Sequence, residues 1–159
     1  VGKINDIFNG VGVTSTVHTV SNSDGMAKTL DLVKDSNFKE GLCFVNLVEF
    51  DSEYGHRRNP VGYGKALETF DKELDVLIKN LRENDLLMIT ADHGNDPTWV
   101  GTDHTREKVP LLIYSKLLND GKKLEDRNPF ADIGDTILKN FNLTKEENMI
   151  GEAIEEVIR

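Results

Sequence analysis

Cysteine is nearly absent from this chain, since Cys43 is the only one among 159 residues. A single cysteine cannot form an internal disulfide, which is compatible with a cytosolic protein. Cys43 lies within an apolar run at residues 41–45, so we expect a buried and unreactive thiol. A disulfide-stapled architecture is therefore excluded for the chain.

Long apolar runs and an excess of positive charge are also missing. No stretch approaches the ~20 apolar residues of a membrane span. The first residues show no charged segment followed by an apolar run, so we expect no secretory signal there. The chain has 19 Lys and Arg against 28 Asp and Glu, a formal net charge of -9. This balance argues against binding to nucleic acid or to an anionic membrane surface.

Strand-like and helix-like patterns alternate along the chain, which is long enough for one domain with a core. Residues 21–24 offer capping side chains for a helix over about residues 25–34. Pro60 and Gly62 precede a long amphipathic helix with apolar residues at three-to-four spacing. The alternation predicts an α/β fold with a largely parallel sheet flanked by helices. The predicted strands cover residues 14–19, 42–50, 86–91 and 109–114, and two further helices cover residues 133–141 and 150–158.

Three of the four histidines lie near acidic residues in two loops that each follow a predicted strand. Parallel α/β sheets bind ligands at the carboxyl ends of their strands, where both loops are placed. Surface loops collect polar residues in any case, but three such groupings together favour a metal site. The candidate ligands are Asp51 and His56 in the first loop, and Asp92, His93 and His104 in the second.

These loops form a set of oxygen and nitrogen donors without a thiolate. Such a set suits manganese, zinc or iron, and the excess of carboxylate favours manganese. Two divalent ions held close together are a recurrent catalyst of phosphate chemistry. Asp51 and His56 can share an ion only if a loop folds back between them, which Gly55 would help. We interpret Asp96 and Asp103 as supporting or loop-capping residues.

Three arginines accompany the loops and are weak candidates for substrate binding. Arg57, Arg58 and Arg106 could engage phosphate oxygens in a forked geometry. A solvated or structural ion pair explains each of them equally well.

Several short motifs are spread along nearly the whole chain. They are GKI (2–4) with DIF (6–8), SNSDGM (21–26), NLVEFD (46–51), YGHRR (54–58), TADHG (90–94) and GTDHTRE (101–107). Together these motifs resemble the phosphopentomutase family of the alkaline phosphatase superfamily. The YGHRR stretch distinguishes this family from general phosphatases.

The resemblance implies a cytoplasmic enzyme that uses two Mn²⁺ ions. Such an enzyme moves phosphate between C1 and C5 of a pentose phosphate substrate, either ribose or deoxyribose. It further implies that Asp51, His56 and His104 hold one ion, whereas Asp92 and His93 hold the second. A phosphorylated threonine that bridges the two ions would transfer the phosphate.

The family pattern also contains an N-terminal core segment, the nucleophilic threonine and a cap domain, none of which we match to residues 1–159. We therefore expect this chain to be the C-terminal part of the metal-binding core. Its partner would be the missing N-terminal part of the same enzyme. Residues 1–159 themselves would carry no catalytic nucleophile. Alone, it is expected to bind manganese or zinc weakly and to be inactive.

Other members of the superfamily share a two-metal scaffold, so the spacing of Asp and His separates them poorly. The alternatives are cofactor-independent phosphoglycerate mutase and a phosphatase or sulfatase. The YGHRR and DHTRE (103–107) stretches favour the pentose mutases. A metal-binding fragment without catalysis is the alternative from a different class.

Overall fold

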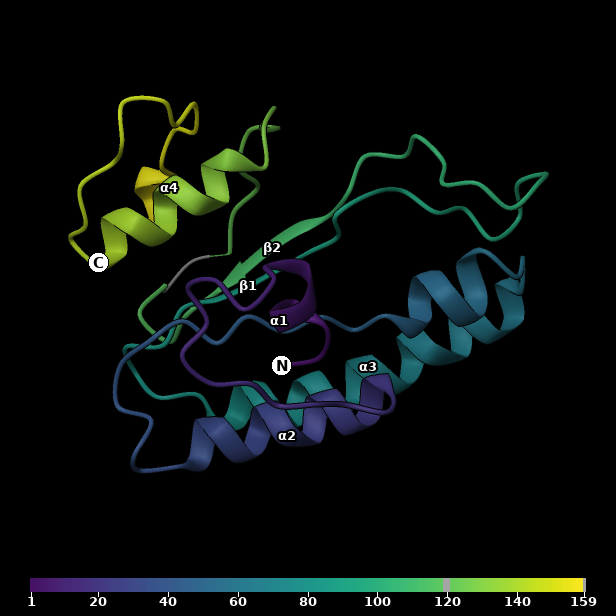
Figure 1. Ribbon diagram of the computed structural model, residues 1–159, viewed down its shortest axis with the longest axis horizontal. Helices are drawn as coiled ribbons and strands as arrows, with labels where there is room; N and C mark the ends of the chain where they lie inside the picture. The colour runs from purple at the N-terminus through teal and green to yellow at the C-terminus, as the bar shows by residue number, and fades with distance from the viewer. Residues whose placement is uncertain (119–120, 159) are drawn as a thin grey trace. The chain divides into compact units, whose positions relative to one another are not determined.

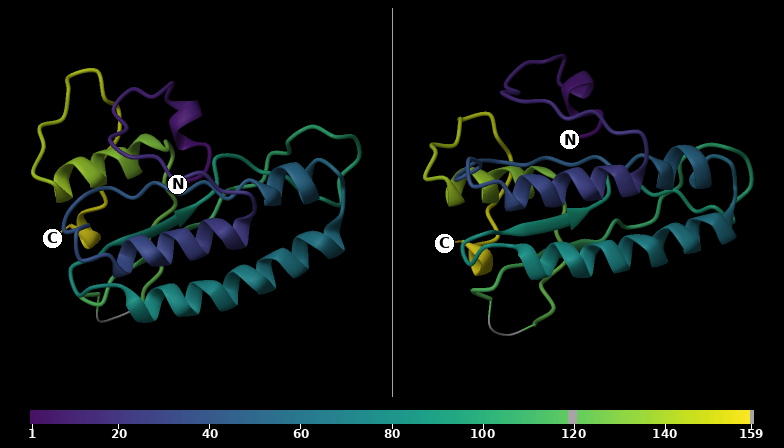
Figure 2. Two further views of the ribbon diagram at one scale, coloured as in Figure 1. Left: turned by 60° about the horizontal axis from the view of Figure 1, so that its bottom comes forward. Right: turned by 90° about the horizontal axis from the view of Figure 1, so that it is seen from below.

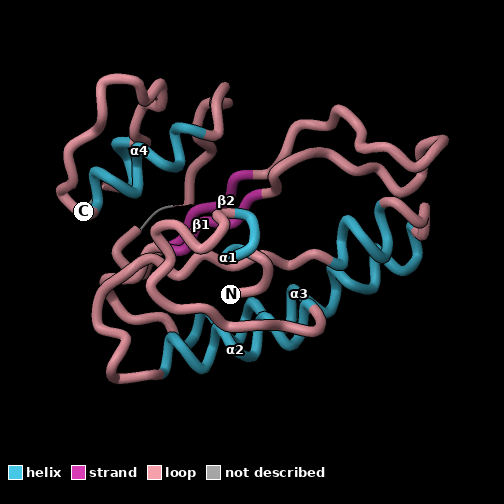
Figure 3. The backbone as a smooth tube through the Cα atoms, viewed as in Figure 1, coloured by secondary structure: helices cyan, strands magenta, loops and turns pink. Residues whose placement is uncertain are grey.

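The computed structural model describes residues 1–118 and 121–158 of the chain (Figure 1). Helices and a small sheet together give an α/β class, as the sequence predicted (Figure 3). The chain separates into two compact units rather than one. The first contains residues 1–85 and 89–112, and the second contains residues 86–88 and the chain from residue 113 onward.

Two helices dominate the first unit and lie side by side, α2 (Asn22–Lys34) and α3 (Pro60–Asn80) (Figure 2). The side chain of Ser21 accepts a hydrogen bond from the Asp24 N–H and so caps α2. The Asn59 side chain caps α3 in the same way, and Pro60 occupies its first turn. Both helices thus form as predicted but begin earlier than expected, α2 at Asn22 rather than about Gly25 and α3 at Pro60 itself. A short helix, α1 (Ile4–Ile7), precedes them.

The sheet is smaller than predicted. Among the described residues it has two strands, β1 (Leu87–Thr90) and β2 (Leu111–Tyr114). The predictions of strands at residues 14–19 and 42–50 were wrong, because neither segment forms a ladder with other described residues. An extended segment becomes a strand only when a second strand satisfies its backbone groups.

A few backbone bonds tie those two extended segments to the start of the chain, among them one from the N-terminal amine of Val1 to the carbonyl of Phe44 (2.8 Å). The N–H of Gly2 donates to the carbonyl of Val17 (2.9 Å), and that of Asn46 donates to Val1 (3.2 Å). Phe44 stays half exposed. Cys43 is half-buried rather than buried, and desolvation raises the pKa of its thiol. That shift favours the unreactive thiol form that the sequence predicted.

The second unit is built on α4 (Ala131–Asn140). A helix over residues 150–158 was predicted wrongly, because only the 3₁₀ turn η2 (Glu155–Val157) forms there. Side chains of α4 instead accept hydrogen bonds from two backbone N–H groups of this segment, and a helix would direct one of them, that of Ile154, to residue 150. Asp132 Oδ1 accepts from the Glu152 N–H (2.8 Å), and Thr136 Oγ1 accepts from the Ile154 N–H (2.9 Å).

Among the described residues, no helix combines the length and the apolar character that crossing a membrane requires.

Candidate metal centre

One π-helical turn, η1 (Phe50–Gly55), carries the acidic part of the site. The backbone N–H of His56 donates to the carbonyl of Asp51 (2.8 Å), which is the five-residue spacing of a π-helix. This turn brings Asp51 and His56 to the same side. The prediction that a loop folds back between Asp51 and His56 is therefore wrong, because a π-helical turn joins the two residues.

Two histidines come from the excursion between β1 and β2. Residues 91–110 run outward and return (Figure 3), and an antiparallel bridge joins Gly94 to Thr105. The bridge places His93 and His104, the residues just before its two members, diagonally across the ribbon on one face. Their rings stack with centroids 3.6 Å apart.

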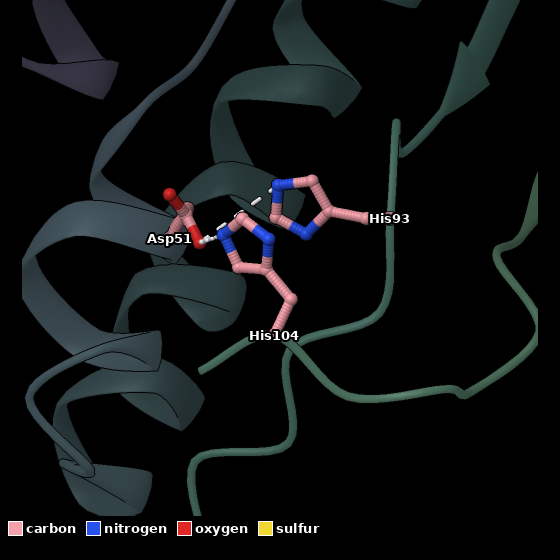
Figure 4. Close-up of side chains that lie close together, drawn as sticks. All are labelled: Asp51, His93 and His104. Atoms are coloured by element: carbon pink, nitrogen blue, oxygen red, sulfur yellow. Dashed lines mark ion pairs between the residues drawn. The ribbon is translucent and has the colours of Figure 1, made fainter. Parts of the chain in front are cut away.

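Asp51 lies at the centre of the resulting cluster. Its Oδ1 is 3.4 Å from His104 Nε2 and 4.0 Å from His93 Nε2. Figure 4 shows the carboxylate and both rings pointing toward one another. The donor atoms of these three residues all lie within 4.8 Å of one another. His56 joins them, with Nε2 3.4 Å from Asp51 Oδ2 and 3.1 Å from His104 Nε2.

The imidazole orientations fit a cation. Nδ1 of His56 faces the carbonyl of Thr102, and Nδ1 of His93 faces the carbonyl of Gly94 (3.2 Å). Since a carbonyl can only accept, each Nδ1 carries a proton, and the neutral form of such a ring has its lone pair on Nε2. Convergent lone pairs beside a carboxylate are favourable when a positive ion lies among them. The donor set therefore suits a divalent transition ion.

Asp92 stands at the rim of the cluster. Its side chain is 85% exposed, and Oδ1 is 3.6 Å from His93 Nε2. All five predicted ligands thus belong to one neighbourhood within the first unit. The three-residue group in the structure combines Asp51 and His104 with His93, whereas the family resemblance places His93 on the other ion.

The three arginines differ in their surroundings. Arg58 is engaged by the protein, because its guanidinium donates to Asn95 and to four backbone carbonyls. Arg57 is exposed and pairs with Glu53 (3.1 Å). Arg106 is exposed and opposes His93 in the register of the Gly94–Thr105 bridge.

Asn95 is a residue of the site that the sequence did not single out. Its Nδ2 donates to Asp51 Oδ1 (2.6 Å). Its place two residues after His93 was the available signal, because the period of an extended ribbon puts both on one face. Asp96 caps its own loop as predicted, and hydrogen bonds from the hydroxyl and the N–H of Thr98 lower its pKa.

Burial raises the pKa of Tyr63, and the negative charge of Asp51 raises it further.

Comparison with known proteins agrees with this chemistry. The chain is 56% identical over 143 residues to a phosphopentomutase of Levilactobacillus brevis, covering 90% of this chain and 36% of that protein. It is 54% identical over 154 residues to a phosphopentomutase of Clostridium beijerinckii, covering 97% of this chain and 38% of that protein. It is 53% identical over 156 residues to a phosphopentomutase of Clostridium tetani, covering 98% of this chain and 39% of that protein.

The chain thus spans between a third and two fifths of the length of these curated relatives. The sequence profile of the Metalloenzyme superfamily matches residues 2–145. Because this match covers most of the chain, the protein belongs to the Metalloenzyme superfamily.

Proposed function

We propose that this chain supplies metal ligands to a phosphopentomutase. Such an enzyme interconverts the 1-phosphate and 5-phosphate of ribose or deoxyribose. The observation that carries the proposal is the convergence of Asp51, His93 and His104 in a chain 53–56% identical to proteins of that name. The activity is proposed for a protein of the relatives' full length, acting in the cytoplasm.

Within that protein, residues 1–159 would form the C-terminal part of the metal-binding core. The nucleophilic threonine would come from the part of the relatives' length that this chain does not match. The ligands are assigned on the family pattern. Asp51, His56 and His104 would hold one Mn²⁺, and Asp92 and His93 would hold the second, with Zn²⁺ as an alternative ion.

The surroundings of three of the ligands indicate their roles. The carbonyls of Thr102 and Gly94 hold the rings of His56 and His93 with Nε2 toward the cluster. When bound, two divalent ions neutralise phosphate charge and activate an attacking oxygen. Asp92 is exposed at the rim, so it can meet ligands from another segment without rearrangement of the first unit.

Arg106 is the best placed of the arginines to contact the phosphate of the substrate. It opposes His93 in the ribbon register, so the two side chains share a face. Arg57 is exposed and would have to leave Glu53 to reach a phosphate. Arg58 has its donors occupied by protein acceptors, which favours a structural role.

The proposal is tested first by metal binding. Isothermal titration calorimetry of the chain with Mn²⁺ and with Zn²⁺ is expected to show saturable binding. Asp51→Ala should abolish that binding, whereas Asp71→Ala, an exposed carboxylate on α3, should not. A wild-type chain that binds neither ion would contradict the proposed role.

Turnover separates the competing activities. A protein of the relatives' length should convert ribose 1-phosphate to ribose 5-phosphate, and residues 1–159 alone should not. Preferential action on phosphoglycerate would favour the phosphoglycerate mutases, and net release of phosphate would favour a phosphatase. Full turnover by residues 1–159 alone would refute the proposal that the nucleophilic threonine lies outside them. Metal binding without turnover, both by residues 1–159 and by a protein of the relatives' length, would favour a non-catalytic domain.

A further inference from the structure

The side chain of Asn95 bridges the guanidinium of Arg58 and the carboxylate of Asp51 at the centre of the cluster. Its Oδ1 accepts from Arg58 Nη1 (2.8 Å), and its Nδ2 donates to Asp51 Oδ1 (2.6 Å). The two ends of an amide are otherwise interchangeable in shape. Here the orientation is determined, because a guanidinium has only donors and a carboxylate only acceptors.

Arg58 is itself held in place. Besides Asn95, its guanidinium donates to the carbonyls of Gly55 (3.1 Å) and Asp96 (2.8 Å). Two further bonds reach the carbonyls of Gly101 and Asp103, the latter just before His104. Because the guanidinium donates hydrogen bonds to backbone carbonyls, it is held in place beside the amide. It therefore anchors the side chain of Asn95.

Space for the amide comes from Gly55. A Cβ at that position would lie 2.3 Å from Asn95 Nδ2 and 2.9 Å from the carbonyl of Phe50. Any side chain larger than hydrogen would thus compete with the amide for its place beside η1. The absence of a side chain at Gly55 is what lets the second loop reach Asp51.

We propose that Asn95 is a positioning residue of the metal centre, with Arg58 fixing Asn95. Its amide occupies one lone pair of Asp51 Oδ1, the oxygen that also faces His104 and His93. The carboxylate is thereby prevented from rotating and keeps Oδ2 toward His56. Bonded partners behind a metal ligand commonly change metal affinity by about 10- to 100-fold. The inference rests on the metal centre proposed above and adds the device that orients its central ligand.

The test compares Asn95→Ala with Thr98→Ala by calorimetry with Mn²⁺. Thr98 is exposed in the same loop, and among the described residues its hydrogen bonds go to Asp96, which makes it a matched control. Asn95→Ala should weaken Mn²⁺ binding roughly 10-fold or more, and Thr98→Ala should leave it unchanged. Equal affinities of the two variants would overturn the inference.

A positioning role differs from a merely structural one in two readouts. The visible spectrum of the Co²⁺-loaded chain should change in Asn95→Ala, because a freed carboxylate can bind through two oxygens, and stay unchanged in Thr98→Ala. The effects of Arg58→Ala and Asn95→Ala on affinity should be less than additive, since both act through one amide. An unchanged Co²⁺ spectrum, or strictly additive effects, would overturn the inference.

Failure of the metal centre is distinguishable from failure of this inference. In the metal-free chain, the side-chain amide protons of Asn95 should exchange slowly with solvent by NMR. Asp51→Ala should make them exchange rapidly. Absence of metal binding with this coupling intact would defeat the proposed function alone, whereas rapid exchange in the wild type would defeat the positioning role.

Discussion

Gly94 is the position where a single methyl group should damage the metal centre most directly. The Gly94–Thr105 bridge brings the two excursion strands into close backbone contact. A Cβ at Gly94 would lie 2.7 Å from the carbonyl oxygen of Thr105 and 2.8 Å from the backbone N of Glu107. Ordinary contacts begin at 3.4 Å, so two backbone atoms would have to retreat. Backbone cannot relieve the clash by changing a rotamer, as a flexible side chain can.

The expected cost of Gly94→Ala depends on whether the ribbon stays closed. Overpacking that moves backbone costs about 1–3 kcal/mol. We expect the free energy of unfolding to fall by about that amount if the ribbon stays closed. If the ribbon opens instead, the chain loses the hydrogen bond from the Thr105 N–H to the Gly94 carbonyl (3.1 Å), which costs about 1 kcal/mol. His93 and His104 then separate, and metal binding is lost.

Urea unfolding followed by circular dichroism in EDTA measures the first quantity, and titration with Mn²⁺ measures the second. Gly64→Ala on α3 is the matched control, since its Cβ would meet nothing within 4 Å. That change should stabilise the chain by about 0.4–1 kcal/mol and leave metal affinity unchanged. A Gly94→Ala variant as stable as wild type, with equal affinity for Mn²⁺, would refute the reasoning.

Three further outcomes are expected. Gly55→Ala should displace the amide of Asn95 and weaken Mn²⁺ binding in calorimetry as much as Asn95→Ala does, whereas unaltered affinity would argue against the close contact. Asp132→Ala should lower the free energy of unfolding by about 2–4 kcal/mol in urea, because it leaves Arg127 Nε and the Glu152 N–H without their acceptor. Burial raises the pKa of Asp132, but the Glu152 N–H and Arg127 outweigh it and hold that pKa below its ordinary value of 3.8. The stability from this shift is therefore complete above the unfolded value and is lost as the pH falls through the lower folded value. The free energy of unfolding measured in urea should consequently fall more on acidification for the wild type than for Asp132→Asn. Parallel pH curves for the two proteins would show that Asp132 is not the origin of the acid sensitivity.

Local signals predicted that α2 and α3 form, although both helices begin a few residues earlier than expected. The cap at Ser21 and the proline at Pro60 specify where α2 and α3 begin, and those signals depend only on neighbouring residues. The segments at residues 14–19 and 42–50 show the limit of such signals. Their extended character is local, but a strand also needs a partner, and sequence pattern does not specify one.

The helix predicted at residues 150–158 failed for a related reason. Its apolar pattern was compatible with a helix, but Thr136 on α4 accepts from the Ile154 N–H that a helix would direct to residue 150, and Asp132 accepts from the Glu152 N–H. Those bonds join residues 18 to 20 positions apart. A competition between local and distant acceptors is decided by tertiary packing, and no local periodicity reports it.

By itself, the sequence determined the chemistry of this protein. The residue types of Asp51, His93 and His104 specify a divalent cation, and their positions after apolar runs indicated where they would gather. Only the tertiary structure decided how they gather, through the π turn at Asp51 and the ribbon closed at Gly94. It also decided what holds them, the amide of Asn95 against Arg58, because that contact joins side chains 37 residues apart. Ligand chemistry belongs to single residues, whereas orientation belongs to the contacts that only a folded chain can make.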